Sequence, residues 1–298
     1  MTEFPDYSKK VLWFPGNGSE IVKLIFVMIL GAAWALPAVA GPLLMGEQAN
    51  GSVIVSTRQA LEPAGDTVSF RGRPVDLVLS PDGTIAFVKD NRGLVVIEAA
   101  AWTLRQELPF IDDEGGSMHG IAVSADGASV YLTTAKNRMF EARVDAAGKW
   151  DWAGSVSFPG PGKDQASFPC GIALTRNGKT ALVCLSRNNS LAEVDLASRT
   201  IARNIPTGVA PYEVRLSEDE KGAFVSNWGG RPPTADEPSA PSSGTKVRVD
   251  ARGVGASGSV SRFELADGHE AWQADTGLHP SAMALAGGVL YVANVNSD

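Results

Sequence analysis

Short apolar runs alternate with polar turn residues along most of the chain. In residues 75–79 and 121–123 every second side chain is apolar, and a period of two places these side chains on one face of a β-strand. Three such runs are followed by Asp82-Gly83, Asp126-Gly127 and Asn177-Gly178. These pairs supply the positive φ angles that tight hairpins require, so the pattern predicts a series of β-hairpins.

The same pattern recurs in five segments, which begin at Pro74, Met118, Pro169, Pro211 and Pro280. Each segment continues with a second apolar strand, and a polar turn and a third strand follow; a weaker fourth strand is expected in segments such as residues 200–205. Four antiparallel strands in about 40 to 50 residues are typical of a propeller blade. A β-sandwich would need roughly seven strands in about 100 residues without a fixed repeat. The sequence therefore predicts an all-β fold, a β-propeller of four-stranded antiparallel blades.

The last repeat reaches Asp298 directly after its second strand. We therefore expect about four and a half blades of a ring of about seven, with residues 65–298 forming an incomplete propeller. Residues 65–71 occupy the position of a fourth strand and are predicted to complete a final blade whose other strands would follow Asp298. Residues 229–258 interrupt the fourth repeat and are rich in Pro, Ser and Gly. They are predicted to form a long surface loop, which either shapes the rim of the propeller that faces a ligand or is simply exposed to solvent.

An apolar segment, residues 24–36, follows Lys23 and ends shortly before Ala38-Val39-Ala40. A basic flank, an apolar run and small residues before a cleavage point are the parts of a secretory signal peptide, which predicts cleavage after Ala40. Residues 1–40 are then the signal peptide and residues 41–64 a lead-in to the propeller. A membrane helix needs about 20 apolar residues, so an uncleaved anchor is the lesser alternative. The expected location is periplasmic or extracellular, with no stable membrane span after cleavage.

Export would place Cys170 and Cys184 in an oxidising compartment, where a pair of cysteines is a candidate disulfide. In a hairpin that turns at Asn177-Gly178, the two sulfur atoms would be diagonal rather than facing. A disulfide and a pair of buried free thiols are therefore both compatible with the sequence.

Two segments, Tyr-Val-Ala-Asn at 291–294 and Phe-Val-Ser-Asn at 224–227, resemble the signature of the YVTN-repeat propeller family. Residues 72–77 (GRPVDL), 226–231 (SNWGGR) and 291–298 (YVANVNSD) are similar to the propeller part of exported bacterial proteins in which a YncE-like propeller precedes an alkaline-phosphatase-type phosphoesterase domain. The resemblance covers residues 50–298 and implies a phosphoesterase domain downstream as a partner. The chain departs from the signature at Lys89-Asp90, and it has no counterpart of that domain's nucleophile and metal ligands. No catalytic residue, metal ligand or cofactor is therefore assigned to it.

The formal net charge is −7 and Lys and Arg do not cluster, which argues against a nucleic-acid partner. The starts of the first strands in a propeller converge on its central channel, and this position selects candidate ligand-binding residues. The candidates are Asp76, His119, Tyr212 and Glu213, together with Asn227 and Trp228 beside the insertion. The two acids suit either a hydrated channel lining or a cation held by several oxygens.

Two functions follow from these residues. The first is an exported scaffold that binds a small ligand or docks a partner domain and is not catalytic by itself. The second is a propeller hydrolase of the lactonase type, in which acids in the channel hold a metal ion. Only two of the five repeats carry an acid at the relevant position, at Asp76 and Glu213, which favours binding.

Overall fold

The computed structural model describes residues 44–297, and over that range the chain contains strands and turns but no helix. No described segment is thus a helix able to cross a bilayer. The predicted signal peptide lies outside the described residues. The chain divides into two units, residues 1–66 and 67–298. In the described part of the first unit, three short strands form an antiparallel sheet: β1 (Gly46–Glu47), β2 (Val53–Ile54) and β3 (Ala60–Leu61).

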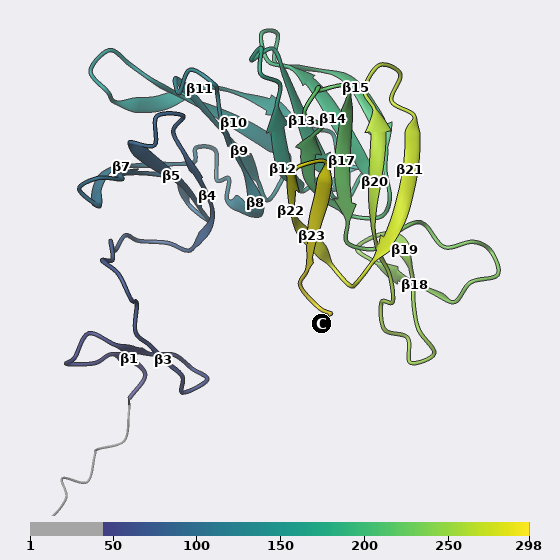
Figure 1. Cartoon of the computed structure of the whole chain (residues 1–298), viewed down its shortest axis with the longest axis horizontal. Helices are drawn as coiled ribbons and strands as arrows, with labels where there is room; N and C mark the ends of the chain where they lie inside the picture. The colour runs from purple at the N-terminus through teal and green to yellow at the C-terminus, as the bar shows by residue number, and fades with distance from the viewer. Residues whose placement is uncertain (1–43, 298) are drawn as a thin grey trace, which may run out of the picture. The chain divides into compact units, whose positions relative to one another are not determined.

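The described part of the second unit contains four four-stranded antiparallel sheets and two two-stranded ones (Figure 1). The first blade consists of β4 (Pro74–Leu79), β5 (Ile85–Asp90), β6 (Gly93–Glu98) and β7 (Thr103–Pro109). The second consists of β8 (Gly116–Val123), β9 (Ser129–Thr134), β10 (Arg138–Val144) and β11 (Trp150–Ser157). The third consists of β12 (Pro169–Leu174), β13 (Thr180–Leu185), β14 (Ser190–Asp195) and β15 (Thr200–Pro206).

The fourth blade consists of β16 (Pro211–Leu216), β17 (Gly222–Asn227), β20 (Gly258–Glu264) and β21 (Glu270–Thr276). The last sheet contains only β22 (Pro280–Ala286) and β23 (Val289–Asn294). The first strands contact one another in the order β4, β8, β12, β16 and β22, so consecutive blades stand side by side around a common centre. The predicted all-β fold with propeller blades is confirmed, and so is the succession of four full blades and part of a fifth within the described residues.

A polar side chain stabilises the turn after each first strand of the four full blades. In the first blade the Ser80 hydroxyl donates a hydrogen bond to Asp82 (2.6 Å), and the Thr84 backbone N–H donates to the same carboxylate (3.0 Å). These bonds favour the ionised form and lower the pKa of Asp82 to about 2. The corresponding pairs in the next three blades are Ser124 with Asp126, Thr175 with Asn177, and Ser217 with Asp219. The same hydrogen-bond arrangement thus stabilises the equivalent turn in all four full blades.

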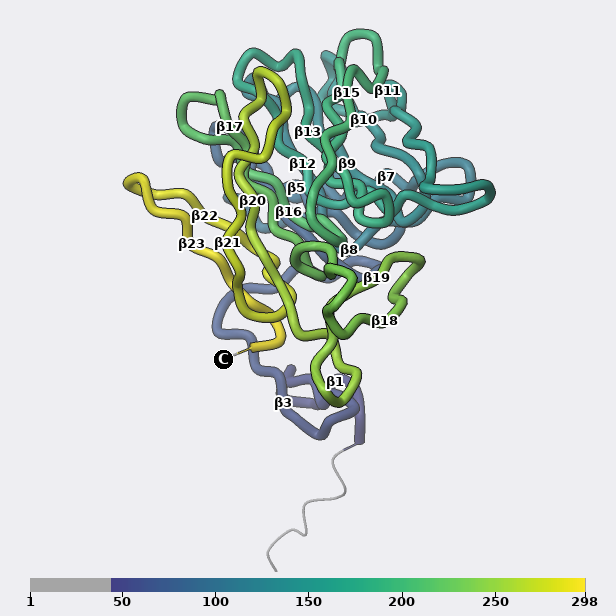
Figure 2. Tube along the Cα trace, turned by 90° about the vertical axis from the view of Figure 1, so that its right-hand side faces the viewer, coloured from purple at the N-terminus to yellow at the C-terminus, as the bar shows by residue number. Residues whose placement is uncertain are grey.

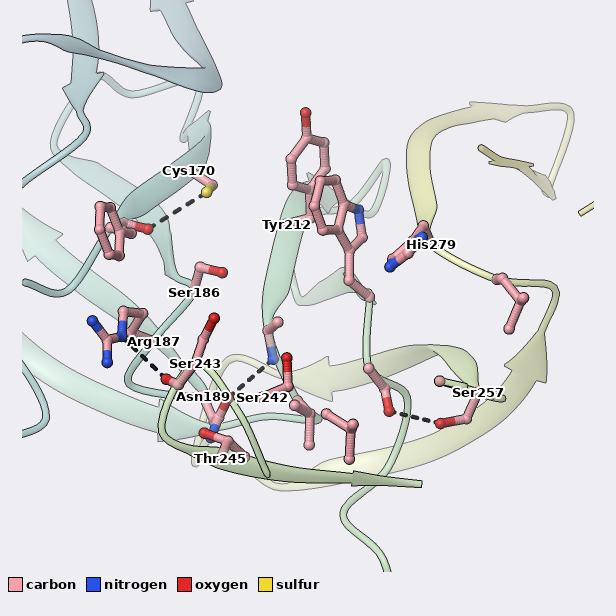
Figure 3. A pocket seen from close by; sticks show the side chains of 18 of the residues that line it. Cys170, Ser186, Arg187, Asn189, Tyr212, Ser242, Ser243, Thr245, Ser257 and His279 are labelled. Carbon is pink, nitrogen blue, oxygen red and sulfur yellow. Dashed lines mark hydrogen bonds between the residues drawn. The ribbon is translucent and has the colours of Figure 1, made fainter. Parts of the chain in front are cut away.

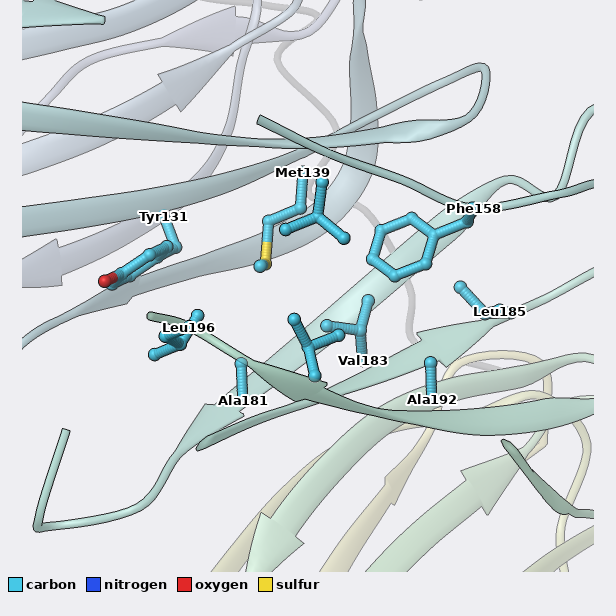
Figure 4. Close-up of a cluster of buried hydrophobic side chains, with 10 residues drawn as sticks. Tyr131, Met139, Phe158, Ala181, Val183, Leu185, Ala192 and Leu196 are labelled. Carbon is cyan, nitrogen blue, oxygen red and sulfur yellow. The ribbon is translucent and has the colours of Figure 1, made fainter. Parts of the chain in front are cut away.

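The core of the described chain consists of separate apolar clusters, one at each junction between blades and a further one on the first blade alone. Between the second and third blades, Tyr131, Met139 and Phe158 pack against a surface that includes Val183 and Leu185 (Figure 4). Between the first and second blades, the rings of Phe87 and Trp150 meet edge to face at 4.8 Å. Because each blade buries its faces against its neighbours, the free energy of unfolding of the unit comes largely from the contacts between neighbouring blades.

Residues 65–71 do not form the strand that the sequence predicts. Val68 and Phe70 instead pack on an apolar cluster of the first blade, formed by Ala86, Val88, Val95 and Ile97. The two apolar side chains are thus sheltered, but no strand within the described residues pairs with their backbone. A strand needs a ladder partner, and the predicted partners of this segment would follow Asp298.

The insertion is more ordered than the predicted loop. It contains a hairpin, β18 (Ser239–Ser242) and β19 (Thr245–Arg248), which projects from one end of the fourth blade (Figures 1 and 2). Ser243 and Gly244 have φ angles of 48° and 87°, as a two-residue hairpin turn requires. At the base of the insertion, Arg231 forms an ion pair with Glu237, and this pairing lowers the pKa of the Glu237 carboxyl to about 2. Order therefore comes from a turn and an ion pair rather than from apolar burial.

Side chains near the ends of the second strands join one blade to the next. Thr133 donates a hydrogen bond to the Cys170 carbonyl of the third blade (2.9 Å), and Ser226 donates to the Ser281 carbonyl of the last sheet (3.3 Å). Lys89 holds the equivalent position in the first blade and lies 2.6 Å from the His119 carbonyl. We call these three contacts the blade clips. Each is a hydrogen bond from a side-chain donor to the backbone of the following blade.

Lys89 is fully buried, and its ammonium group lies within hydrogen-bond distance of four oxygens. These are the hydroxyls of Ser117 (2.8 Å) and Thr133 (2.9 Å) and the carbonyls of His119 (2.6 Å) and Gly120 (3.2 Å). Burial removes the charge from water and lowers the pKa of Lys89 from 10.5 to about 7.

The Lys89→Met variant is expected to change how stability depends on pH. Between about pH 7 and 10.5 the unfolded chain keeps the Lys89 proton that the folded chain releases, so wild-type stability rises with pH in this window. From about pH 6.5 to about pH 8.5, the free energy of unfolding of the wild type should gain about 2 kcal/mol relative to the variant. Urea denaturation of both proteins at the two pH values measures this change. An unchanged difference would show that the buried Lys89 keeps an ordinary pKa.

Candidate functional site

A pocket of about 870 Å³ lies at the end of the blades where first strands begin and second strands end (Figure 3). Cys170 and Tyr212 reach it from the starts of β12 and β16, and Ser186 and Trp228 reach it from the ends of β13 and β17. The β18–β19 hairpin supplies a further wall. All lining residues belong to the second unit. A cavity of this size is large enough for a small organic ligand.

The backbone around the pocket is strained at three equivalent places. Phe168, Ala210 and His279 have φ angles of 48°, 54° and 52°, and each directly precedes the proline that opens a first strand. A non-glycine residue in this region costs about 1 to 3 kcal/mol and persists only where its surroundings hold it. The Phe168 N–H donates to the Lys136 carbonyl (3.0 Å), and the Ala210 N–H donates to the Asn189 side chain (2.9 Å). All three strained residues line the pocket, so its wall is rigidly positioned.

Aromatic rings form one side of the site. The Tyr212 and Trp228 rings stack with their centroids 4.3 Å apart and an interplanar angle of 18°. His119 stacks on Tyr212 at 5.1 Å, and His279 meets Trp228 edge to face at 5.2 Å. Burial raises the pKa of Tyr212 to about 12, so its hydroxyl remains a neutral donor at physiological pH. The Trp228 indole N–H is buried and has no hydrogen-bond partner within the described chain.

Polar and cationic side chains gather on another side, where the hairpin meets the third blade (Figure 3). Arg187 donates from Nε to the Ser243 carbonyl (3.2 Å), and its guanidinium lies 5.7 Å from the Phe168 ring centroid. Asn189 donates to the Thr245 hydroxyl (3.0 Å). These contacts attach the hairpin to the third blade, so the hairpin is a fixed part of the wall.

Two of the six candidate ligand-binding residues, Tyr212 and Trp228, line the pocket. Asp76 and His119 lie behind that wall, with Asp76 Oδ2 2.8 Å from His119 Nδ1 and 2.8 Å from the Gly120 amide nitrogen. Burial alone would raise the pKa of Asp76, but the bonds from His119, Gly120 and Leu77 outweigh it and hold the pKa below its usual value. Asp76 thereby connects the first blade to the second.

Glu213 connects the fourth blade to the last sheet in a similar way. Its carboxylate accepts a hydrogen bond from the Met283 amide (2.6 Å) and forms an ion pair with Arg215 (2.6 Å). Asn227 is fully buried within its own blade, where it donates to the hydroxyls of Ser259 and Ser261. Neither residue is among those that line the pocket. Over residues 44–297, no group of three or more His, Cys, Asp and Glu side chains converges as a metal site would require.

In this structure Cys170 and Cys184 are both free thiols and both buried, which corresponds to the second of the two alternatives. The register pairs Pro169 with Leu185 and then shifts at a bulge that contains Cys170, while Cys184 pairs with Leu191 on the other side of its strand. Burial raises the pKa of Cys170 to about 11 and that of Cys184 well above its usual value. Both thiols are therefore protonated at neutral pH.

Sequence reasoning missed most of the polar wall. The pocket residues it did not select include Arg73, Phe168, Arg187, Asn189, Arg248 and the Ser and Thr side chains of the hairpin. Arg187 and Asn189 lie in the turn between a second and a third strand, which is the end of the blade that carries Trp228. That shared position is the signal that could have identified them.

No family model matches the chain, and no curated protein matches it. Among solved structures, the chain is similar to hydrazine synthase from Kuenenia stuttgartiensis, with 20% identity and a TM-score of 0.51 over 74% of this chain and 54% of that chain. It is also similar to a protein from Lactobacillus plantarum, with 17% identity and a TM-score of 0.50 over 77% of this chain and 65% of that chain. The chain thus spans about half the length of the first protein. At these identities the likeness shows the fold alone, that of a β-propeller.

Proposed function

We propose that this chain is a ligand-binding propeller that is not catalytic by itself. The observation that carries the proposal is the pocket of about 870 Å³, whose wall is built by several blades and the β18–β19 hairpin. The strained residues Phe168, Ala210 and His279 border this pocket, and strain of this kind accumulates where a site must be preorganised. A preformed concave site with a few convergent polar groups is the usual form of a small-molecule site.

The second function from the sequence, a lactonase-type hydrolase, is supported less well. It uses acids of the channel to hold a metal ion, but Asp76 and Glu213 already accept hydrogen bonds from backbone amides of neighbouring blades. The carboxylates of Asp76 and Glu213 therefore hold neighbouring blades together in this structure, instead of pointing together at a metal ion. Binding therefore accounts for more of the observed geometry.

The setting of this binding function is also a proposal. The apolar segment before Ala40 supports export to the periplasm or the cell exterior. The YVTN-like segments and the resemblance to two-part bacterial proteins support a role as the accessory propeller of a phosphoesterase whose catalytic domain is not in this chain. In that setting the propeller would bind the ligand or dock the partner domain.

Thermal unfolding with a defined panel of sugars, amino acids, nucleotides and aromatic acids tests the binding function. At least one class is expected to raise the melting temperature, because a ligand that binds only the folded state stabilises it. In the Ser242→Trp variant, an indole on the hairpin fills part of the pocket and should abolish the shift. Ala197→Trp, in the exposed turn between β14 and β15, is the matched control and should keep it. No shift with any class, or equal shifts in both variants, would contradict binding in this pocket.

A further inference from the structure

The geometry points to a ligand class: we infer that the pocket takes an organic anion that carries a flat ring, with the acid group at Arg187 and the ring against Tyr212 and Trp228. This inference rests on the proposed binding function and names what is bound. Three observations carry it: the charge of the residues that line the pocket, the hydrogen bonds that its arginines leave unmade, and the separation of its polar side from its aromatic side.

The charge of the wall is opposite to that of the chain. The chain has a formal net charge of −7, yet Arg73, Arg187 and Arg248 line the pocket, and no Asp or Glu among residues 44–297 does. A concave surface with one sign of charge raises the local concentration of ligands of the opposite sign. The pocket therefore selects against cations and favours anions.

Arg187 retains hydrogen-bonding capacity for a ligand. Its Nε atom donates to the Ser243 carbonyl, which fixes the guanidinium plane, and no carboxylate pairs with it within residues 44–297. A fixed guanidinium can bind a carboxylate or phosphate through two parallel N–H donors, which are charge-assisted and strong. Ser186, Ser242 and Thr245 lie beside Arg187 and can add neutral donors (Figure 3).

Arg248 adds a second cation that its own partners do not satisfy. Its Nε is 3.6 Å from a Glu237 oxygen, and its Nη1 is 3.8 Å from an Asp275 oxygen. Both distances are beyond hydrogen-bond range, and Nη1 is buried without a hydrogen-bond partner in the described structure. Arg248 lines the pocket, so its positive charge adds to the attraction for an anion there.

The aromatic side specifies the rest of the ligand. Tyr212 and Trp228 both line the pocket, so their stacked rings give it an aromatic side next to the cationic side. In Figure 3, Tyr212 and His279 lie away from the cluster around Arg187 and Ser243. Aromatic side chains favour planar apolar partners. A planar ring with an acid group matches both sides at once.

Four naphthalene compounds test this ligand class by isothermal titration: naphthoate, naphthyl phosphate, naphthol and naphthylmethylamine. They share the ring and differ in the charge and kind of the polar group, so they separate a carboxylate ligand from a phosphate ligand. At least one of the two anions is expected to bind about tenfold tighter than naphthol. The cationic amine should bind more weakly than naphthol, because it meets only like charges in the wall.

Three variants assign the effect to residues. Arg187→Met should weaken the preferred anion about tenfold and leave naphthol affinity unchanged, whereas Arg187→Lys should recover part of the loss. Trp228→Leu should weaken all ring compounds, naphthol included. Arg105→Met is the control, since Arg105 pairs with Glu98 in the first blade and does not line the pocket.

The outcomes separate the ligand class from the binding function. Equal affinity for naphthol and both anions, or an anion preference that survives Arg187→Met, would overturn the anion while leaving ligand binding intact. Absence of binding by all four compounds would overturn the ring-bearing anion, and the broader compound panel would then decide whether the pocket binds small molecules at all.

Discussion

Replacing Gly120 by alanine is expected to destabilise the propeller by about 4 kcal/mol or more. Gly120 has a φ angle of +107°, and a Cβ atom there would lie 2.0 Å from the Cys170 carbonyl oxygen and 2.3 Å from the Thr133 hydroxyl oxygen. The carbonyl belongs to the first strand of the next blade and cannot move without opening the junction between the second and third blades. Urea denaturation measures the loss.

Gly83 provides the matched control for this substitution. Its φ angle of +73° also disfavours a side chain, but a Cβ atom there would meet nothing within 4 Å. Gly83→Ala should therefore lower the free energy of unfolding only by the strain of a positive φ angle, about 1 kcal/mol. If Gly120→Ala were no more destabilising than Gly83→Ala, the close approach of the second and third blades at Gly120 would not limit stability.

Glu213→Ala is expected to cost about 3 kcal/mol and to loosen the last sheet first. Glu213 is buried, and its carboxylate accepts a hydrogen bond from the Met283 amide in β22. Without the carboxylate, this buried amide loses its partner, whereas the more exposed Arg215 can turn to water. Hydrogen exchange of the β22–β23 amides together with the melting temperature would measure the effect.

Glu213→Gln distinguishes the hydrogen bond from the packing of the side chain. The glutamine carbonyl can accept from the Met283 amide but carries no charge, so this variant should lose less stability than the alanine variant. Equal losses in the two variants, with unchanged exchange in β22–β23, would mean that Glu213 does not join the fourth blade to the last sheet.

The strands were predictable because their signals are local. The alternating residues of the first strands and the Asp-Gly and Asn-Gly pairs lie within a few positions of one another, and the turn at Asp82 depends only on Ser80 and Thr84. Residues 65–71 carry the same local alternation without a partner strand in the described structure. The strands predicted to pair with this segment would follow Asp298, so its place in a blade stays a prediction.

The site was less predictable because its parts are distant in sequence. Tyr212 and Trp228 could be selected from the ends of their strands, but Arg187 belongs to the site because the hairpin contacts the third blade. The composition of the insertion suggested a loop, and its hairpin depends on a turn at Ser243-Gly244. Asp76 and Glu213 were placed at the correct strand positions, yet their carboxylates are used by amides of adjacent blades. Such pairings arise only once the blades are assembled.

The blade clips also affect how the blades of this protein can be recombined. Thr133 and Ser226 each offer one hydroxyl to one carbonyl of the following blade. A foreign blade at the first joint would need that carbonyl and a close fit to Gly120, and one at the second would need that carbonyl and an amide for Glu213. Lys89 instead depends on an oxygen cage to which the following blade contributes Ser117, His119, Gly120 and Thr133. The first two blades thus form an inseparable pair for shuffling or transplantation, while the later blades are closer to interchangeable modules.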